Sequence, residues 1–360
     1  MLKILYVSPE NTVGTLSYWK KAHELNGHYC RYVTFFKTIA GFENDILLNL
    51  PLIASRPWYI KGRKALSRLA EGREIHANLR GYPPIWNPPA WQKKVMAWRE
   101  ILWQPKINHA IREYDLDNFD VYHFEWGLDF YRDARFARQL KARGKKIVCH
   151  YHGQDMRNRG VIPEMDALSD LNLTNELDLT YLHPNLKYLF LPYDVWAFET
   201  KKKIGDPITI CHATTNRIIK GSDFIISTCR ELEKSHGIRF LLIENQSHEK
   251  AIQLKSQADI CIDHIGELTW GYGMNSLESL SMGIATATYL NETYVQFIPD
   301  YPFINVRPDN LKQSLIHYIQ NPELILKKGQ EGRCWVEKYH DYRNVVQQLY
   351  DYYRQIGIEV

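Results

Sequence analysis

The sequence lacks any run of about 20 consecutive apolar residues, the length that a transmembrane helix needs. The apolar run at the amino terminus, Leu2 to Val7, is too short for the apolar region of a signal peptide, and no small-residue cleavage site follows it. The six cysteines have neither metal-ligand spacing nor a compact disulfide pattern. These absences predict a cytoplasmic protein whose cysteines are buried, reduced thiols.

A strong excess of charge of one sign is also missing, since the net charge is only +4 over 360 residues. The overall balance therefore argues neither for nor against nucleic-acid binding. Apolar residues make up 45% of the chain and charged residues 24%, which is typical of a folded globular protein. At roughly 150 residues per domain, the length predicts two domains, with a cleft between them as the natural ligand site.

Strand-like and helix-like segments alternate along both halves of the chain. In the first half, strand-like runs lie at residues 2–8, 29–36, 119–127 and 145–153, with helical patterns at 16–25 and 128–143. In the second half, strand-like runs lie at 208–213, 238–245, 258–264 and 285–290, with helical patterns at 222–234 and from Met274 onward. Such alternation implies parallel sheets, so we predict an α/β fold of two Rossmann-like, doubly wound domains.

The predicted domains are residues 1–200 and 201–335, facing each other across a cleft. The polar run FETKKKIGDP, residues 198–207, is the predicted linker. An apolar series with helical spacing follows the second sheet, and it predicts a C-terminal helix at 336–360 that packs back on the first domain.

A glycine-containing loop precedes the predicted helix at Met274. Backbone N–H groups and the positive dipole end at such a helix start suit a diphosphate. Glu278 lies just over one turn into the helix, where its carboxylate would accept hydrogen bonds from ribose hydroxyls. Since many glycine loops only turn the chain, the loop by itself is equally compatible with a simple turn.

Arg217 and Lys220 follow the strand-like run at 208–213, at the end where doubly wound sheets bind ligands. Arg217 suits bidentate contact with a phosphate, and Lys220 would act as a point charge on the same group. Ordinary solvated surface charges are the alternative interpretation.

In the first half, the polar segment HYHGQDMR follows the strand-like run that begins at Lys145. His150 and His152 cannot be ranked by their chemistry alone, and a histidine at such a place is often structural. Asp155 and Arg157 are close enough in sequence that we expect them to pair with each other.

Together, these segments resemble glycosyltransferase family four, the retaining enzymes of the GT-B fold. HGQDMR is similar to the family's His-Gly-x-Asp segment, NRIIKG to its Arg and Lys-Gly pair, and GYGMNSLESLSMG to its glycine loop and nucleotide-binding glutamate. NTVGTLSYWKKAHELNGH resembles the family's N-terminal loop and helix, although only Gly14 stands where two glycines often occur. The likeness covers most of the chain.

The resemblance implies transfer of a sugar, with retention of configuration, from a nucleotide-diphosphate-sugar donor to a glycan or lipid-linked acceptor. The reaction would need neither a cofactor nor a metal. His152 would contact the donor sugar, while Arg217 and Lys220 would stabilise charge on the leaving diphosphate. The donor-binding residues would be Gly14, Gly273, Met274, Asn275, Ser276 and Glu278.

One position departs from the family pattern: Trp270 stands where a further glutamate is common, eight residues before Glu278. We interpret Trp270 and Tyr272 as candidate contacts to the sugar or base, with packing as the alternative. The departure leaves the identity of the donor open. Two other functions are also open. One is a nucleotide-sugar epimerase or phosphorylase on the same fold, and the other is a sugar- or nucleotide-binding protein that has lost turnover.

Residues 51–115 carry 12 Lys and Arg against five Asp and Glu, and five of the ten tryptophans. We interpret this stretch as an inserted acceptor-side subdomain or lid. One hypothesis is contact with an anionic lipid surface at the inner face of the membrane or with a polyprenyl-phosphate-linked acceptor, because indoles favour the interface and cations favour anionic headgroups. Local core plus solvated charge is the alternative. Such a composition also suits single-stranded nucleic acid, but nothing else resembles a nucleic-acid module, and we predict no such partner.

Overall fold

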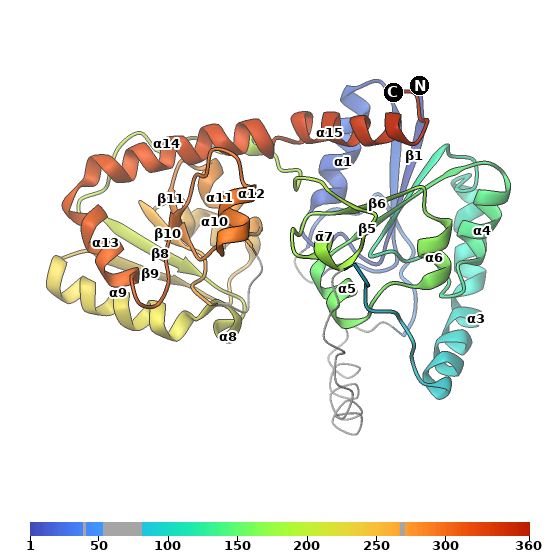
Figure 1. Cartoon of the computed structure of the whole chain (residues 1–360), viewed down its shortest axis with the longest axis horizontal. Coiled ribbons are helices and arrows are strands. Elements are labelled where there is room, and N and C mark those ends of the chain that lie inside the picture. Colours follow the sequence, from blue (N-terminus) through green and yellow to red (C-terminus); the bar gives the residue numbers. More distant parts are fainter. Residues whose placement is uncertain (39–40, 53–80, 267–270) are drawn as a thin grey trace. The chain divides into compact units, whose positions relative to one another are not determined.

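The computed structural model describes residues 1–38, 41–52, 81–266 and 271–360 (Figure 1). The chain forms two compact units, one of Met1–Leu189 with Val346–Val360 and the other of Phe190–Val345. Each unit has a parallel sheet with helices around it. The predicted α/β class with two Rossmann-like domains is therefore confirmed.

In the described residues, the sheet of the first unit has the strand order β3-β2-β1-β4-β5-β6-β7. The strands are β1 (Lys3–Ser8), β2 (Tyr29–Thr34), β3 (Ile46–Leu47), β4 (Val121–Glu125), β5 (Lys146–Tyr151), β6 (Leu171–Thr174) and β7 (Leu186–Tyr188). The order changes direction between β1 and β4, and doubly wound sheets bind ligands beside the carboxyl ends of the strands at such a point. The segments after β1, β4 and β5 therefore share the edge where a ligand is expected.

The helices of the first unit follow from apolar spacing and from local caps. They are α1 (Thr15–Leu25), α3 (Ala90–Glu113), α4 (Arg135–Ala142), α5 (Gly153–Asn158), α6 (Pro163–Leu168), α7 (Leu179–Leu182) and most of α15 (Tyr342–Gln355). The predicted helix at 128–143 begins only at Arg135. Ala134, inside the predicted range, has a φ of 56°, which a continuous right-handed helix does not allow.

Side chains of α15 complete the core of the first unit. The Tyr350 hydroxyl lies 2.9 Å from Nδ1 of His23, and the Tyr353 hydroxyl contacts Nε2 of His123. All four groups are buried. Burial lowers the pKa of His23 well below its ordinary value, so this ring is neutral and takes part in the cluster as an uncharged group.

Part of the tryptophan-rich stretch, residues 51–115, belongs to the core of the first unit. Trp103, Ile107 and Ala110 on the second half of α3 lie in the core of the first unit, so the predicted insertion does not include this half. Trp58, Arg63, Lys64 and Arg68 lie outside the described residues.

The sheet of the second unit has the order β12-β11-β10-β8-β9 in the described residues. Its strands are β8 (Thr209–Ala213), β9 (Arg239–Ile243), β10 (Ile260–Ile262), β11 (Ala285–Thr288) and β12 (Ile304–Asn305). Its helices are the 3₁₀ helix η1 (Val195–Ala197), α8 (Arg217–Lys220), α9 (Ser222–His236), α10 (His248–Lys255), α11 (Met274–Ser281), α12 (Glu292–Phe297), α13 (Leu311–Gln320) and α14 (Pro322–Tyr339). The order changes direction between β8 and β10, so the loops after these strands form the expected ligand edge.

The units divide at Leu189 and Val345, whereas the sequence analysis places the borders at residues 200 and 335. The difference arises because the chain after residue 189 is hydrogen-bonded to the second unit. The Tyr193 N–H donates to the His340 carbonyl at 2.8 Å, and the Lys201 N–H donates to the Met282 carbonyl at 2.9 Å.

All six cysteines are free thiols, and five are buried as predicted. The exception is Cys334, which is exposed on α14. Among the described helices, none is both long enough and apolar enough to cross a lipid bilayer.

Candidate active site

The start of α11 lies at the ligand edge of the second sheet. Gly273 precedes the helix and offers no side chain to cap it, and a Cβ built there would meet no other atom within 4 Å. The N–H groups of Ser276 and Leu277 donate to the Gly273 carbonyl. Those of Met274 and Asn275 have no backbone acceptor within the described part of the chain. This helix start can therefore present two N–H donors and a positive dipole end to an anion.

Asp263, just after β10, connects Lys220 to this helix start. Its carboxylate accepts from Lys220 Nζ at 2.6 Å, from Asn275 Nδ2 at 2.8 Å and from Ser276 Oγ at 2.6 Å. Burial raises the pKa of Asp263, but the Lys220 charge and the hydrogen bonds outweigh burial and hold it well below its ordinary value. Asp263 is therefore ionised and fixes both partners.

Lys220 keeps donor capacity in this arrangement. Its ammonium has three protons, and it donates to Asp263 and, at 3.1 Å, to the Ala213 carbonyl. Its side chain is 19% exposed, so the third proton can reach a ligand at the surface. The buried Ser276 hydroxyl donates to Asp263 and its N–H donates to the Gly273 carbonyl, so Ser276 acts on a ligand by fixing Asp263.

Glu278 is held between Lys255 on one side and His248 on the other. Lys255 Nζ donates to one carboxylate oxygen, and His248 Nε2 lies 2.9 Å from the other. Burial raises the pKa of Glu278, but the Lys255 charge and these hydrogen bonds lower it overall. An ionised carboxylate has about four lone-pair positions, so ribose hydroxyls can still be accepted beside these partners.

Arg217 points to the segment after β9. Its Nε and Nη2 atoms donate to the two carboxylate oxygens of Glu244 at 2.7 and 2.6 Å, and Nη1 lies 3.5 Å from Asp223. The guanidinium is half exposed, with side-chain exposure of 49%. Unlike Lys220 and Glu278, Arg217 is not tied to the start of α11, and it would have to leave Glu244 to give a bidentate contact elsewhere.

Among the described residues, the charges at the ligand edge of the second unit are thus largely paired. Three cations each face a carboxylate, in the pairs Arg217 with Glu244, Lys220 with Asp263 and Lys255 with Glu278. An incoming diphosphate would compete with these carboxylates for the cations.

Tyr272 lies in an aromatic cluster. Its hydroxyl is 3.0 Å from His340 Nε2, and its ring contacts Phe303 and Trp335 at centroid distances of 5.2 and 5.4 Å. Burial lowers the pKa of His340 to about 3, and Nδ1 faces the Leu191 carbonyl, so Nε2 accepts the tyrosine proton. Trp270 lies outside the described residues, and Gly271, beside it, has φ +103° and no room for a Cβ against the Tyr294 ring.

In the first unit, Gly14 forms the start of α1 with φ 80°, and the loop before it is ordered by a buried asparagine. Asn11 accepts from the Leu16 N–H at 3.3 Å and donates to the Glu43 carbonyl at 2.9 Å. Gly14 lies at the carboxyl edge of the first sheet, on a unit separate from Lys220 and Glu278.

His152, after β5, is paired with Glu125 at the end of β4. His152 Nε2 lies 2.7 Å from Glu125 Oε2, and His150 Nδ1 lies 3.4 Å from Oε1. Burial raises the pKa of Glu125, but the two histidines outweigh burial and lower it well below its ordinary value. Burial lowers the pKa of His152, but the hydrogen bond and charge of Glu125 raise it overall. His152 is therefore a better proton carrier near neutral pH than an isolated buried histidine.

Among the described residues, one group could hold a metal ion, because its possible ligand atoms all lie within 4.8 Å of one another. It consists of Glu125, His150 and His152. Two imidazoles and a carboxylate suit a divalent transition metal. A metal with bonds of about 2.1 Å spans at most about 4.2 Å between ligands, so these atoms would have to move closer together. The 2.7 Å contact fits a hydrogen-bonded pair, and metal independence stays a prediction.

The expected pairing of Asp155 with Arg157 is wrong. Asp155 accepts from the His152 N–H at 2.8 Å, which fixes the first turn of α5. Arg157 donates to Asp178 at 2.6 Å and also contacts Glu176. A Cβ on Gly153 would lie 2.0 Å from the Arg157 guanidinium, so this arrangement requires glycine.

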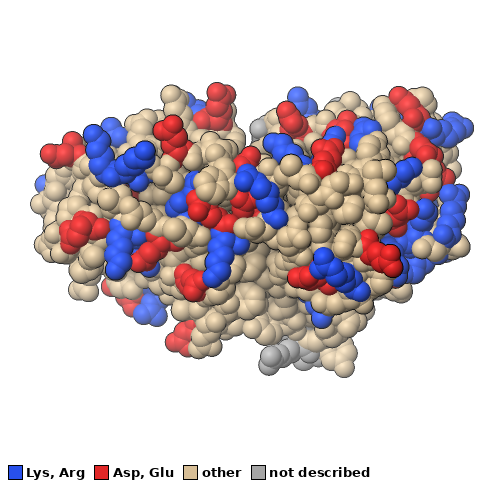
Figure 2. All heavy atoms as spheres, turned by 90° about the horizontal axis from the view of Figure 1, so that it is seen from above, with Lys and Arg blue, Asp and Glu red and all other residues tan. Residues whose placement is uncertain are grey.

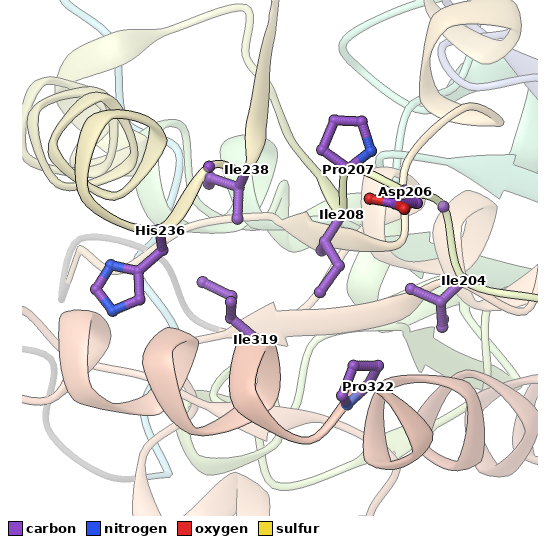
Figure 3. Close-up of a pocket in the computed structure, with 10 residues that line it drawn as sticks. Ile204, Asp206, Pro207, Ile208, His236, Ile238, Ile319 and Pro322 are labelled. Atoms are coloured by element: carbon purple, nitrogen blue, oxygen red, sulfur yellow. The ribbon is translucent and has the colours of Figure 1, made fainter.

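A cavity of about 420 Å³ lies at the other edge of the second sheet, by the amino ends of β8 and β9 (Figure 3). Aliphatic side chains, among them Ile208, Ile238 and Ile319, line most of it, with His236 and Asp206 as its polar groups. It has no cluster of cations for a diphosphate and does not include any predicted site residue.

The surface charge agrees with the modest net charge. On the face in Figure 2, acidic and basic side chains of the described residues are intermixed. This face offers no broad basic field for a nucleic-acid backbone.

Solved structures provide the relevant comparison. Sucrose-phosphate synthase from Thermosynechococcus elongatus is similar with a TM-score of 0.60 and 11% identity over 99% of each chain. HepE from Anabaena, solved in complex with UDP-glucose, is similar with a TM-score of 0.59 and 10% identity over 99% of this chain and 100% of that chain. TarM from S. aureus, solved with fondaparinux, α-GlcNAc-glycerol and UDP, is similar with a TM-score of 0.55 and 9% identity over 98% of this chain and 99% of that chain.

The chain has the GT-B fold. At these identities the comparisons establish the architecture and not the reaction. No protein-family model matches the chain, and no curated protein matches it by sequence. Membership of this GT-B chain in glycosyltransferase family four therefore stays a prediction.

Several residues of the candidate site were not predicted from the sequence. Glu125, Asp263 and Glu244 each stand at or just after the end of a buried strand, the same signal that singled out Arg217 and Lys220. Lys255 and His248 gave no such signal, because nothing in a helical lysine or histidine reveals that it will face a carboxylate 23 or 30 residues away.

Proposed function

We propose that this protein is a retaining, metal-independent glycosyltransferase that moves a sugar from a nucleotide-diphosphate-sugar donor to a glycan or lipid-linked acceptor. The observation that supports the proposal most is the network in which Asp263 holds Lys220 beside the open start of α11. A diphosphate at this position would meet backbone N–H groups, a helix dipole and an ammonium ion.

In the proposed reaction, Lys220 stabilises the negative charge that develops on the leaving diphosphate. Arg217 adds to this once the donor draws it from Glu244. The backbone from Gly273 to Ser276 binds phosphate through the N–H groups of Met274 and Asn275, and Glu278 accepts hydrogen bonds from ribose hydroxyls. Gly14 lets the first loop approach the donor.

His152 is proposed to contact the donor sugar, with Glu125 holding its ring in place. The 2.7 Å pair fixes the orientation of the imidazole and favours its protonated form. A protonated His152 would donate a hydrogen bond to a sugar hydroxyl.

The test is turnover of a panel of UDP-, GDP- and ADP-sugars with mixed glycan and lipid-linked acceptors, in the presence of a metal chelator. We expect acceptor-dependent release of nucleoside diphosphate and a product that keeps the anomeric configuration of the donor, as measured by NMR. Lys220→Met should lower turnover by about 10²–10³-fold, the usual loss for one transition-state donor. Lys203→Met, an exposed lysine of the same unit, is the matched control.

The other outcomes separate the alternatives. Donor turnover without any acceptor would favour an epimerase or phosphorylase. Nucleotide binding with no turnover would favour a binding protein. Full activity in Lys220→Met would refute the assignment of this cation.

A further inference from the structure

The first half of α3 carries an apolar stripe on its outer side. Trp91, Val95, Trp98 and Leu102 recur at intervals of four, three and four residues, which places them on one face of the helix. Their exposures are 51%, 55%, 57% and 42%. We call these four residues the α3 stripe.

The stripe faces outward because the opposite side of α3 is fixed to the first unit. Trp103 and Ile107 are buried in the core. Glu100 is 4% exposed and accepts from the Arg132 N–H at 2.9 Å. Figure 1 shows the amino-terminal half of α3 extending away from the strands of the first unit. The exposure of the stripe is therefore a consequence of how the helix is anchored.

Water-exposed indoles and aliphatic side chains in one row are costly to leave uncovered. Single exposed apolar residues are normal on a protein surface, but contiguous rows on one helix mark an interaction site. Large apolar patches of this kind bind proteins, ligands or membranes, so the charges around the stripe must decide between them.

The charges favour an anionic partner. Between residues 81 and 112 the sequence holds five Lys and Arg and one acidic residue, the buried Glu100. Lys94 is exposed beside the stripe, three residues after Trp91, whereas Lys93 is exposed on the opposite side of the helix. Lysine is depleted at protein interfaces, and a second copy of the chain would bring the same positive segment against itself. Tryptophan and lysine together suit the interface of a membrane with anionic lipids.

We propose that the α3 stripe docks the protein peripherally on an anionic lipid surface. The indoles of Trp91 and Trp98 enter the headgroup region, and Lys94 beside them contacts anionic headgroups. Among the described helices none spans a bilayer, so the attachment is interfacial. The docking surface does not depend on the proposed transfer reaction, and it narrows the membrane hypothesis to one helix face.

The experiment is flotation of the full chain with vesicles of phosphatidylcholine alone or mixed with phosphatidylglycerol, at low and high salt. We expect binding to the anionic vesicles that weakens at high salt. Lys94→Gln should weaken it roughly fivefold, the contribution of one lysine near such a surface, and Lys93→Gln, on the opposite side of the helix, should weaken it less. Trp91→Ser with Trp98→Ser should weaken binding at both salt concentrations.

Leu25→Ser changes an exposed apolar residue of the same unit, with exposure of 66%, and should leave binding unchanged. All substituted side chains are exposed, and unchanged thermal unfolding would verify that the variants fold. The proposal is overturned if wild type fails to float with anionic vesicles, or if Trp91→Ser with Trp98→Ser floats like wild type. It is equally overturned if the tryptophan substitutions only abolish self-association, as seen by sedimentation velocity.

Discussion

The buried pair of Lys255 and Glu278 makes a quantitative prediction about stability. Lys255 is 1% exposed and Glu278 7%, and the carboxylate keeps His248 as a second partner. Lys255→Met keeps the side-chain volume but leaves the carboxylate without its cation. Removing one partner of a buried ion pair lowers the free energy of unfolding by about 3–5 kcal/mol. Because His248 still contacts the Glu278 carboxylate, we expect a loss of about 3 kcal/mol. For a unit of this size, Tm should fall by about 6–12 °C.

The loss should depend on pH in a defined direction. In wild type, the folded-state pKa of Glu278 is lowered, so its stabilising contribution is complete above the unfolded value of about 4.3 and disappears as the pH falls through the folded pKa. In Lys255→Met, burial dominates and raises the folded pKa above the unfolded value. The charge then destabilises the fold at neutral pH, and protonation at low pH removes this penalty. The stability difference between the two proteins should shrink as the pH is lowered toward about 4.

Urea unfolding at several pH values, followed by circular dichroism, measures both effects. Lys250→Met, on the exposed side of the same helix, is the matched control and should change stability little. Adding Glu278→Gln to Lys255→Met should recover most of the loss, because the uncompensated charge is gone. A loss below about 1 kcal/mol at pH 7, or one independent of pH, would refute the argument that the pair is electrostatically coupled and buried.

Two further predictions concern the cation and the histidine of the site. Glu244→Gln removes the partner of Arg217, so the guanidinium is released toward a diphosphate. The Kd for a nucleoside diphosphate should therefore fall by up to about fivefold, the equivalent of one exposed ion pair. Calorimetry that finds weaker binding would contradict this. Glu125→Gln leaves burial as the main influence on the pKa of His152, which should therefore drop from above the ordinary histidine value to below that value. An unchanged NMR titration of the His152 ring would show that Glu125 does not control its pKa.

The strands and the ligand edges could be predicted because buried parallel strands are nearly continuous apolar runs. Ile4, Leu5 and Tyr6 of β1 are fully buried, and their run is visible in the sequence. The strand β6, LNLT, was missed because its asparagine and threonine interrupt the pattern, although all four residues are buried.

Only those residues of the candidate site that follow a strand or a glycine loop could be proposed from the sequence. Lys220 and Glu278 can be proposed from the sequence because they follow a strand and a glycine loop, whereas their partners Asp263 and Lys255 depend on which side chains meet in three dimensions. The same limit explains Arg157, which is near Asp155 in sequence but faces Asp178 across the fold.

The most direct test of the account is hydrogen exchange of the full chain with UDP, GDP and ADP in turn. At least one nucleotide should slow exchange in the segments from Thr214 to Gly221 and from Gly271 to Ser281, and Lys220→Met should weaken this protection. Protection confined to the aliphatic cavity around Ile208 and Ile238, or no protection in either segment with any of the three nucleotides, would contradict it.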